Sequence, residues 1–245
     1  MIIKCKSRKS AVRLNPQLTN KESLKGSTKH RGSLRALYSC YKSTSARIHR
    51  GLIYVSPVSR LKAAKLKRLR PLKLNIGCGK VKFEGWINID IEPGADIVLD
   101  VRKGLPFEEN SVDFVYNEHF LEHLTFEDSS KFLREIYKCL KKGGVVRIAT
   151  PDLDYVLQKY SEDWKDQDWL HTSNYDYIKT KGNMINVSFR EWGHKYLFNE
   201  EDLRNHLLDA GFKSLEKCVI NQSNNVELRG LETRPDSKLI IEATK

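Results

Sequence analysis

From Pro71 onward, the sequence predicts an α/β domain built on a mainly parallel sheet. Short apolar runs with strand character alternate with segments of helical periodicity, the order that produces parallel strands covered by helices. A second observation is the stretch LNIGCGKVKFEGWINID, in which one apolar run enters Gly-Cys-Gly and another ends at an aspartate. That arrangement is typical of a nucleotide cradle at the carboxyl edge of such a sheet.

Seven apolar runs are the predicted strands. Five of them precede a long polar and aromatic segment, and two close the chain. The predicted strands are Lys73–Ile76, Trp86–Ile91, Asp96–Val101, Val112–Tyr116, Val145–Ala149, Lys213–Ile220 and Lys238–Glu242.

Two helices have clear sequence signals. Phe126–Lys142 places its apolar residues on one face, and Gly143 is the expected stop. Glu200–Ala210 follows Asn199, a good N-cap, and carries three acids in its first turn before Gly211.

Charge divides the chain into a basic arm and a mildly acidic body. Residues 1–70 hold 19 Lys and Arg against one acid, whereas residues 71–245 hold 24 basic and 30 acidic residues. We expect 1–70 to be a largely disordered arm, because it is too poor in large apolar residues to build a core. A contact with nucleic acid or an anionic membrane face is the functional alternative, and an organellar transit peptide is another.

Composition excludes several classes of protein. There is no apolar run long enough for a membrane span, and the basic start lacks the apolar core of a secretory signal. The five cysteines lack a C-x-x-C pair, which favours free thiols in a reducing compartment. We therefore expect a cytoplasmic protein. The cysteines are Cys5, Cys40, Cys78, Cys139 and Cys218.

The spacing of the Gly-Cys-Gly turn argues against a dinucleotide. The third glycine of G-x-G-x-x-G is missing, and Asp90 comes only 13 residues after Gly77, which is too close for a full crossover helix. A pyrophosphate would then lack the helix N-terminus that normally holds it. A P-loop is excluded because no G-K-[ST] follows. A nucleoside without phosphates fits better, with Asp90 on the ribose hydroxyls and Asp100 near the base.

At this point the chain resembles a known family. LNIGCG, NID, LDVRKGLPFEENSVDFVYNEHFLEHL and FLREIYKCLKKGGVVRIATPDL are similar, in this order, to class I S-adenosylmethionine-dependent methyltransferases of the type 11 kind. The distal block FREWGHKYLFNEEDLRNHLLDAGF resembles a bacterial subgroup of predicted methyltransferases of this class. Fold alone would not decide among functions.

The resemblance implies a fold, a cofactor and its contacts. It implies a Rossmann-like, seven-stranded, mainly parallel sheet whose last strand is antiparallel, and it implies S-adenosylmethionine as cofactor. The first two crossovers are shorter than usual in this family, which leaves open whether Trp86 or Pro93 lines the pocket. The implied cofactor contacts are Gly77, Cys78, Gly79, Asp90, Asp100, Val101 and Asn117.

The stretch His119-Phe-Leu-Glu122-His123 matches the H-x-x-E-H pattern of inverted zinc proteases. On a helix, its two histidines would share a face and could hold one metal. The position directly after a central strand disfavours a protease. Two alternatives remain: a divalent-ion cluster of His119, Glu122, His123 and His194, or metal-free histidines, of which one is a general base. We favour no metal.

Residues 151–198 form a long aromatic segment after the fifth strand, which predicts a lid or substrate-binding insertion. Most of its aromatic residues are expected to form a small core of their own, while some could face a flat or sugar-like acceptor. His194 is the preferred catalytic candidate, followed by His123 and Asp152. Arg190 is a candidate for holding an anionic group.

These observations predict methyl transfer to a hydroxyl, less so an amine, of a small molecule or glycan. One alternative is an RNA methyltransferase guided by the basic arm, whose activity would fall steeply with salt. Another is a binding protein that kept the fold and lost turnover. An NAD-dependent oxidoreductase is disfavoured by the spacing given above.

Overall fold

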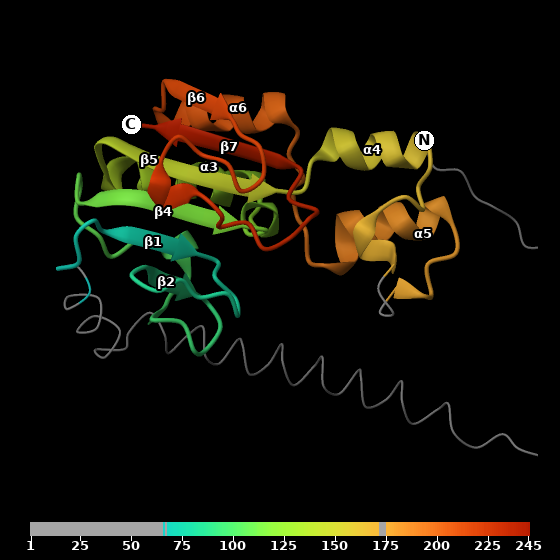
Figure 1. Cartoon of the computed structure of the whole chain (residues 1–245), viewed down its shortest axis with the longest axis horizontal. Coiled ribbons are helices and arrows are strands. Elements are labelled where there is room, and N and C mark those ends of the chain that lie inside the picture. Colours follow the sequence, from blue (N-terminus) through green and yellow to red (C-terminus); the bar gives the residue numbers. More distant parts are fainter. Residues whose placement is uncertain (1–65, 67, 172–174) are drawn as a thin grey trace, which may run out of the picture. The chain divides into compact units, whose positions relative to one another are not determined.

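A computed structural model describes residues 66, 68–171 and 175–245 (Figure 1). Its centre is a seven-stranded sheet with the order β3-β2-β1-β4-β5-β7-β6. The first five strands pair in parallel, and β7 runs antiparallel to both of its neighbours. The predicted architecture is therefore confirmed. The strands are β1 Lys73–Ile76, β2 Ile87–Asp90, β3 Ile97–Val98, β4 Val112–Glu118, β5 Leu140–Thr150, β6 Ser214–Lys217 and β7 Leu239–Thr244.

The connections after β1 and β2 contain no helix in the part of the chain that the structure describes, as the spacing predicts. After β3 there is only a 3-10 turn, Val101–Lys103. The carboxyl ends of the first strands are therefore covered by short loops, and this leaves room for a ligand above them.

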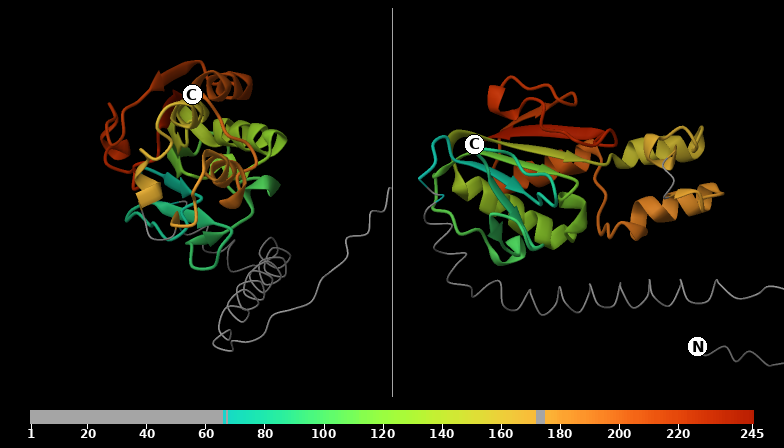
Figure 2. Two further views of the ribbon diagram at one scale, coloured as in Figure 1. Left: turned by 90° about the vertical axis from the view of Figure 1, so that its right-hand side faces the viewer. Right: turned by 60° about the horizontal axis from the view of Figure 1, so that its bottom comes forward.

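Helices α3 (Phe126–Cys139) and α6 (Glu200–Ala210) cover one face of the sheet, as the views of Figure 2 show. Their apolar residues share the main core with the inward side chains of the central strands. On the other face, Tyr116 and Val145 pack with Trp86, Leu228 and Leu231. Both faces are thus closed, which explains why the central strands read as almost continuous apolar runs.

The predicted end of the first helix is wrong. α3 ends at Cys139 and not at Lys142, and Gly143 lies inside β5. Leu140 is extended, with φ −64° and ψ 140°, because it pairs with Val112 of β4. That long-range pairing outweighs the helical periodicity. By contrast, α6 has the predicted bounds.

The insertion 151–198 continues from the end of β5 (Figure 1). It contains α4 (Leu153–Ser161), α5 (Lys181–Asn186) and a π-helical turn, Val187–Glu191. The expectation that most of its aromatic residues build a small core is wrong, because four of the ten do so, while Tyr196 and Phe198 pack with the main core. The small core comprises Ile178, Met184 and Val187, with Trp164, Trp169, Leu170, Tyr175 and Trp192 packed against it.

The basic arm, predicted over residues 1–70, lies outside the described residues except for its last few positions. Its predicted disorder and its nucleic-acid contact therefore stay predictions. Among the described residues, no helix has both the length and the apolar character needed to cross a membrane.

Candidate active site

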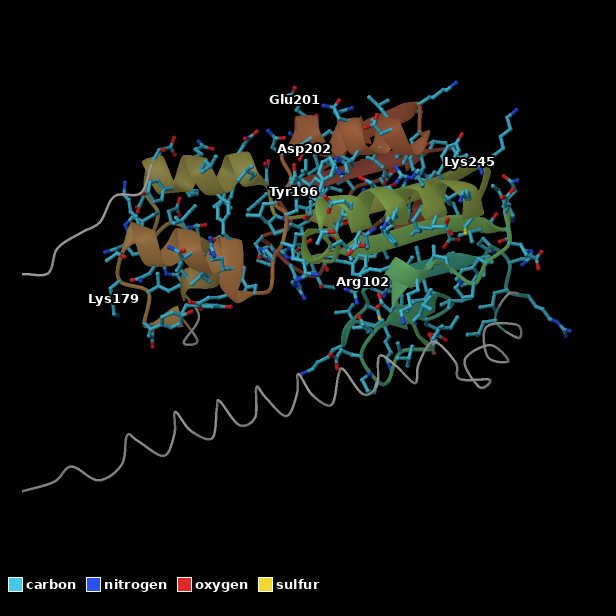
Figure 3. All side chains as sticks on the ribbon, turned by 180° about the vertical axis from the view of Figure 1, so that it is seen from behind. Arg102, Lys179, Tyr196, Glu201, Asp202 and Lys245 are labelled. Atoms are coloured by element: carbon cyan, nitrogen blue, oxygen red, sulfur yellow. The ribbon has the colours of Figure 1, made fainter. Side chains whose placement is uncertain are left out.

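A cavity of about 450 Å³ lies at the carboxyl ends of β1, β2 and β4, where ligands of open parallel sheets bind. Figure 3 shows Arg102, one of its lining residues, at the end of the sheet that faces the insertion. Five of the seven predicted cofactor residues line this cavity: Gly77, Gly79, Asp90, Asp100 and Val101.

The floor of the cavity is the turn after β1. The backbone N–H groups of Gly77 and Cys78 both donate to the carbonyl of Ile89, at 2.9 and 3.2 Å. Gly77 has φ +72°, and a Cβ there would lie 2.3 Å from the ring of Phe120. This position therefore requires glycine for both its backbone angle and its space.

Asp90 at the end of β2 organises the same turn. One of its carboxylate oxygens accepts from the N–H of Gly79 at 2.8 Å, and the other accepts from the N–H of Glu92 at 2.8 Å. A carboxylate offers about four acceptor positions, so each oxygen still has one free. Two adjacent hydroxyl groups, such as those of a ribose, match the two free positions.

Asp100 forms a two-pronged ion pair with Arg102, which the sequence did not predict. Arg102 donates to both carboxylate oxygens, through Nε at 2.8 Å and Nη2 at 2.6 Å. Burial raises the pKa of Asp100, but the hydrogen bonds and charge of Arg102 outweigh it and lower that pKa overall. The carboxylate is thus held ionised at the cavity wall with its guanidinium partner beside it.

Two predicted cofactor residues do not line the cavity. The Cys78 side chain is buried beneath the turn, and burial raises the pKa of its thiol to about 11. Asn117, in β4, is fully buried, and neither atom of its amide group has a hydrogen-bond partner. The predicted contact of each with the cofactor is untested.

The H-x-x-E-H stretch begins the far wall of the cavity, and it is not a continuous helix. His119 has φ +47° and donates its N–H to Ala149 of β5. Only a 3-10 turn, Leu121–His123, follows. The two histidines therefore do not share a helical face, as the protease pattern would require, although His119 and His123 both line the cavity.

Glu122 is the centre of a buried polar cluster with His119, His123 and His194. Its side chain is fully buried, and Oε2 accepts from the hydroxyl of Thr150 at 3.0 Å. Oε1 has no hydrogen-bond partner, although His119 Nδ1 is 3.4 Å away and His194 Nε2 is 3.9 Å away. Burial raises the pKa of Glu122 to about 7.

The insertion brings His194 to this cluster across 71 residues of sequence. Burial lowers the pKa of His119 to about 3 and that of His194 to about 4, and it also lowers the pKa of His123. All three imidazoles are therefore neutral near pH 7. The sequence anticipated this grouping of four residues, although it did not favour it as a metal site.

The other predicted acceptor-side residues lie apart from the cofactor cavity. His194 and Asp152 line a second, narrow cavity of about 30 Å³, walled by Trp169 and Trp192, which is room for about two water molecules. Asp152 caps α4 by accepting from the N–H of Asp154. Arg190 is exposed and lines neither of these two cavities.

Comparison with known proteins finds a family similar to the first five strands of the sheet. Residues 74–148 match the family model of a methyltransferase domain. The part of the chain from β1 to β5 is thus similar to a methyltransferase domain. The match ends at the tip of β5, so the insertion and the bacterial subgroup suggested by residues 189–212 stay predictions.

A relative and two solved structures are also similar. An uncharacterized protein of Methanocaldococcus jannaschii is 28% identical over 125 residues, which are 46% of this chain and 60% of that protein. The chain thus spans 60% of that relative's length. A SAM-dependent methyltransferase from Archaeoglobus fulgidus has 19% identity and a TM-score of 0.45, covering 77% of this chain and 93% of its own. A Haemonchus contortus phosphoethanolamine N-methyltransferase has 21% identity and a TM-score of 0.41, covering 66% and 39%.

The residues that line the cavity fit S-adenosylmethionine, the cofactor that the sequence resemblance implies. The turn at Gly77 leaves no room for a side chain, and Asp90 keeps acceptor positions free. Three basic residues of the cavity were not predicted from the sequence, namely Arg102, Lys195 and Arg234. Lys195 directly follows His194 and could have been found by that adjacency, whereas Arg234 lies in a loop with no motif.

Proposed function

We propose that this protein transfers the methyl group of S-adenosylmethionine to a hydroxyl group of a small molecule or glycan. One observation carries the proposal: a single cavity joins the Gly77 and Asp90 turn to His123 of the buried Glu122 cluster. A donor held at one end of the cavity would face groups suited to hydroxyl activation at the other.

The donor end of the cavity would be built from the two loops after β1 and β2. The turn would pass beneath the amino-acid portion of the cofactor at Gly79, because the space around its Cβ position is open. Asp90 would accept from the ribose hydroxyls, and each such charge-assisted bond contributes about 1.5–3 kcal/mol. The adenine ring of the cofactor would lie beside Val101 and the Asp100–Arg102 ion pair.

The acceptor end would be formed by the cluster and the insertion. His123 lies at the boundary, because it lines the cofactor cavity and packs edge-on against His194, with ring centroids 5.1 Å apart. The tryptophans at 169 and 192 border the adjacent narrow cavity, and aromatic faces suit sugar-like or flat acceptors. Since that cavity is small, the insertion would have to shift to admit an acceptor.

For this reaction the protein has two main tasks: to align the acceptor oxygen with the methyl group and to assist the removal of the hydroxyl proton. When bound, the cofactor supplies an electrophilic methyl group on its sulfonium sulfur, which keeps the electron pair of the broken bond. The chain holds the acceptor oxygen in line with that bond and excludes water. The hydroxyl proton must leave as the oxygen attacks, and the cluster of Glu122, His123 and His194, whose imidazoles are neutral, is the group placed to assist.

Calorimetric titration with S-adenosylhomocysteine tests the donor site. We expect binding in the micromolar range to the wild-type chain, at least tenfold weaker binding to Asp90→Ala, and no binding of NADH. Asp209→Ala, on the exposed face of α6, is the matched control and should bind as the wild type does. Equal affinity in Asp90→Ala, or preference for NADH, would refute the placement.

Transfer of a ¹³C-labelled methyl group tests the acceptor. A panel of simple glycans, aliphatic alcohols and amines would be incubated with the labelled donor, and the carbon chemical shift of the product separates O-methyl from N-methyl groups. O-methyl products support the proposal. N-methyl products alone would contradict the hydroxyl preference while leaving the donor site intact.

A further inference from the structure

We infer that Glu122, His123 and His194 form a binding site for one divalent first-row transition ion, of which Zn²⁺ is the best match. One ligand atom from each of these residues lies within 4.8 Å of the other two. Two histidines and one carboxylate are a ligand set used for zinc and other divalent transition ions in catalytic sites.

The hydrogen bonds of the two histidines leave the Nε2 lone pair of each ring available to a metal ion. His194 Nδ1 lies 2.6 Å from the carbonyl oxygen of Ser188, and His123 Nδ1 lies 3.3 Å from that of Gly193. A carbonyl only accepts, so each Nδ1 carries the hydrogen and each Nε2 keeps a lone pair. A backbone carbonyl on the second nitrogen is the usual way in which a metal-binding histidine is oriented.

The carboxylate adds a third acceptor within 4.8 Å of the two histidine ligand atoms. Glu122 Oε1 is buried without a hydrogen-bond partner and lies 3.9 Å from His194 Nε2. That distance is too long for a shared proton. A buried acceptor facing other acceptors is costly unless a cation lies between them.

The fit requires the three ligand atoms to move closer together, because they now lie within 4.8 Å of one another. Two ligands about 2.1 Å from one ion stand roughly 3.4 Å apart at a tetrahedral angle, compared with the 3.9 Å between Glu122 and His194. Glu122 is fixed by Thr150, and its backbone carbonyl accepts from the N–H groups of Lys195 and Tyr196. The segment that carries His194 is thus hydrogen-bonded directly to the turn that carries Glu122. These bonds keep the two metal ligands close to each other.

Three protein ligands leave a coordination position open, and His123 places it beside the cofactor cavity. This role rests on the proposed function: an acceptor hydroxyl that takes the open position would release its proton to solvent more readily, because the ion lowers its pKa. Binding of the ion itself does not depend on that function. The sequence favoured metal-free histidines, and the two free Nε2 atoms beside an unpartnered carboxylate oxygen lead us to the opposite assignment.

Cobalt provides a direct test, because Co²⁺ replaces zinc and its visible bands report the ligands. The full chain, stripped with chelator, would be titrated with Co²⁺ under reducing conditions and then with competing Zn²⁺. We expect one equivalent to bind with the bands of nitrogen and oxygen ligands and no thiolate charge-transfer band. The affinity should fall at least tenfold in Glu122→Gln, His123→Asn and His194→Asn.

His206→Gln is the matched control, since His206 is a buried histidine of α6 with an unpartnered Nε2. It should keep the wild-type cobalt affinity. Because Glu122 and His194 are buried, the half-buried His123 is the variant least at risk of misfolding. Thermal melting supplies a second readout: Zn²⁺ at a hundredfold excess over its Kd should raise the melting temperature of wild type and control but not of the three ligand variants.

Wild-type cobalt affinity in His123→Asn and Glu122→Gln would overturn the assignment, as would a thiolate band or the lack of binding below millimolar Co²⁺. Titration of the same samples with S-adenosylhomocysteine separates this result from the proposed function. If the chain binds S-adenosylhomocysteine but no metal ion, only the ion site is refuted. If the chain binds the metal ion but not S-adenosylhomocysteine, only the donor site is refuted.

Discussion

Replacing Arg147 with methionine should destabilise the protein strongly, because this side chain is a buried cation with every donor occupied. Its guanidinium donates to both oxygens of Glu232 at 2.6 and 3.0 Å and to Glu242 at 2.7 Å. The two remaining bonds reach the carbonyl oxygens of Gln222 and Val219. The five N–H groups of the guanidinium are thus all used.

The size of the effect follows from what the substitution leaves behind. Methionine fills much of the volume, but Glu232 and Glu242 remain, with side chains 0% and 4% exposed. Removing one partner of a buried ion pair typically costs about 3–5 kcal/mol. The affected loop also carries Arg234 to the cofactor cavity, so affinity for S-adenosylhomocysteine should fall together with stability.

Equilibrium unfolding in guanidinium chloride measures this loss. Lys138→Met, which removes an exposed ion pair with Glu135, is the control and should leave the midpoint unchanged. The triple variant Arg147→Met, Glu232→Gln, Glu242→Gln should recover part of the lost stability, since it removes the stranded charges. A loss below about 1 kcal/mol in Arg147→Met would refute the reasoning.

Three further predictions concern the cradle and the helix above the core. Gly77→Ala should lose both stability and S-adenosylhomocysteine binding, because its Cβ meets Phe120; Gly79→Ala, with open space around it, should melt closer to wild type in calorimetry. Cys78 should resist iodoacetamide at pH 8 until the chain is unfolded, since its thiol is buried with a pKa of about 11, and mass spectrometry would detect early modification. Asn199→Ala should lower the free energy of unfolding by about 1 kcal/mol, because its side chain accepts from the N–H of Asp202 at the start of α6; an unchanged denaturation midpoint would contradict this.

The sequence predicted those features of the structure that depend on neighbouring residues, such as helix ends and the turns at strand ends. α6 begins after Asn199 and ends before Gly211, which has the left-handed conformation with φ 114°. These ends could be predicted because capping residues act within one turn of the helix. The Gly77 turn and Asp90 could likewise be predicted, since both lie at strand ends that the apolar runs define.

Long-range contacts explain what the sequence could not reveal. Leu140 pairs with β4 instead of extending α3, and the N–H of His119 bonds to β5 instead of starting a helix. The loop that brings Arg234 to the cavity is held by Glu118, which accepts from the N–H groups of Thr233 and Arg234. None of these pairings leaves a periodic or spacing signal in the sequence.

Hydrogen exchange with and without S-adenosylhomocysteine tests the central claim most directly, because it locates the ligand on the full chain. With the ligand at saturation, peptides covering 76–79 and 89–102 should exchange more slowly, while those of β6 (214–217) should be unaffected. Unchanged exchange in both loops, or protection confined to another part of the chain, would contradict the placement of the methyl donor in this cavity.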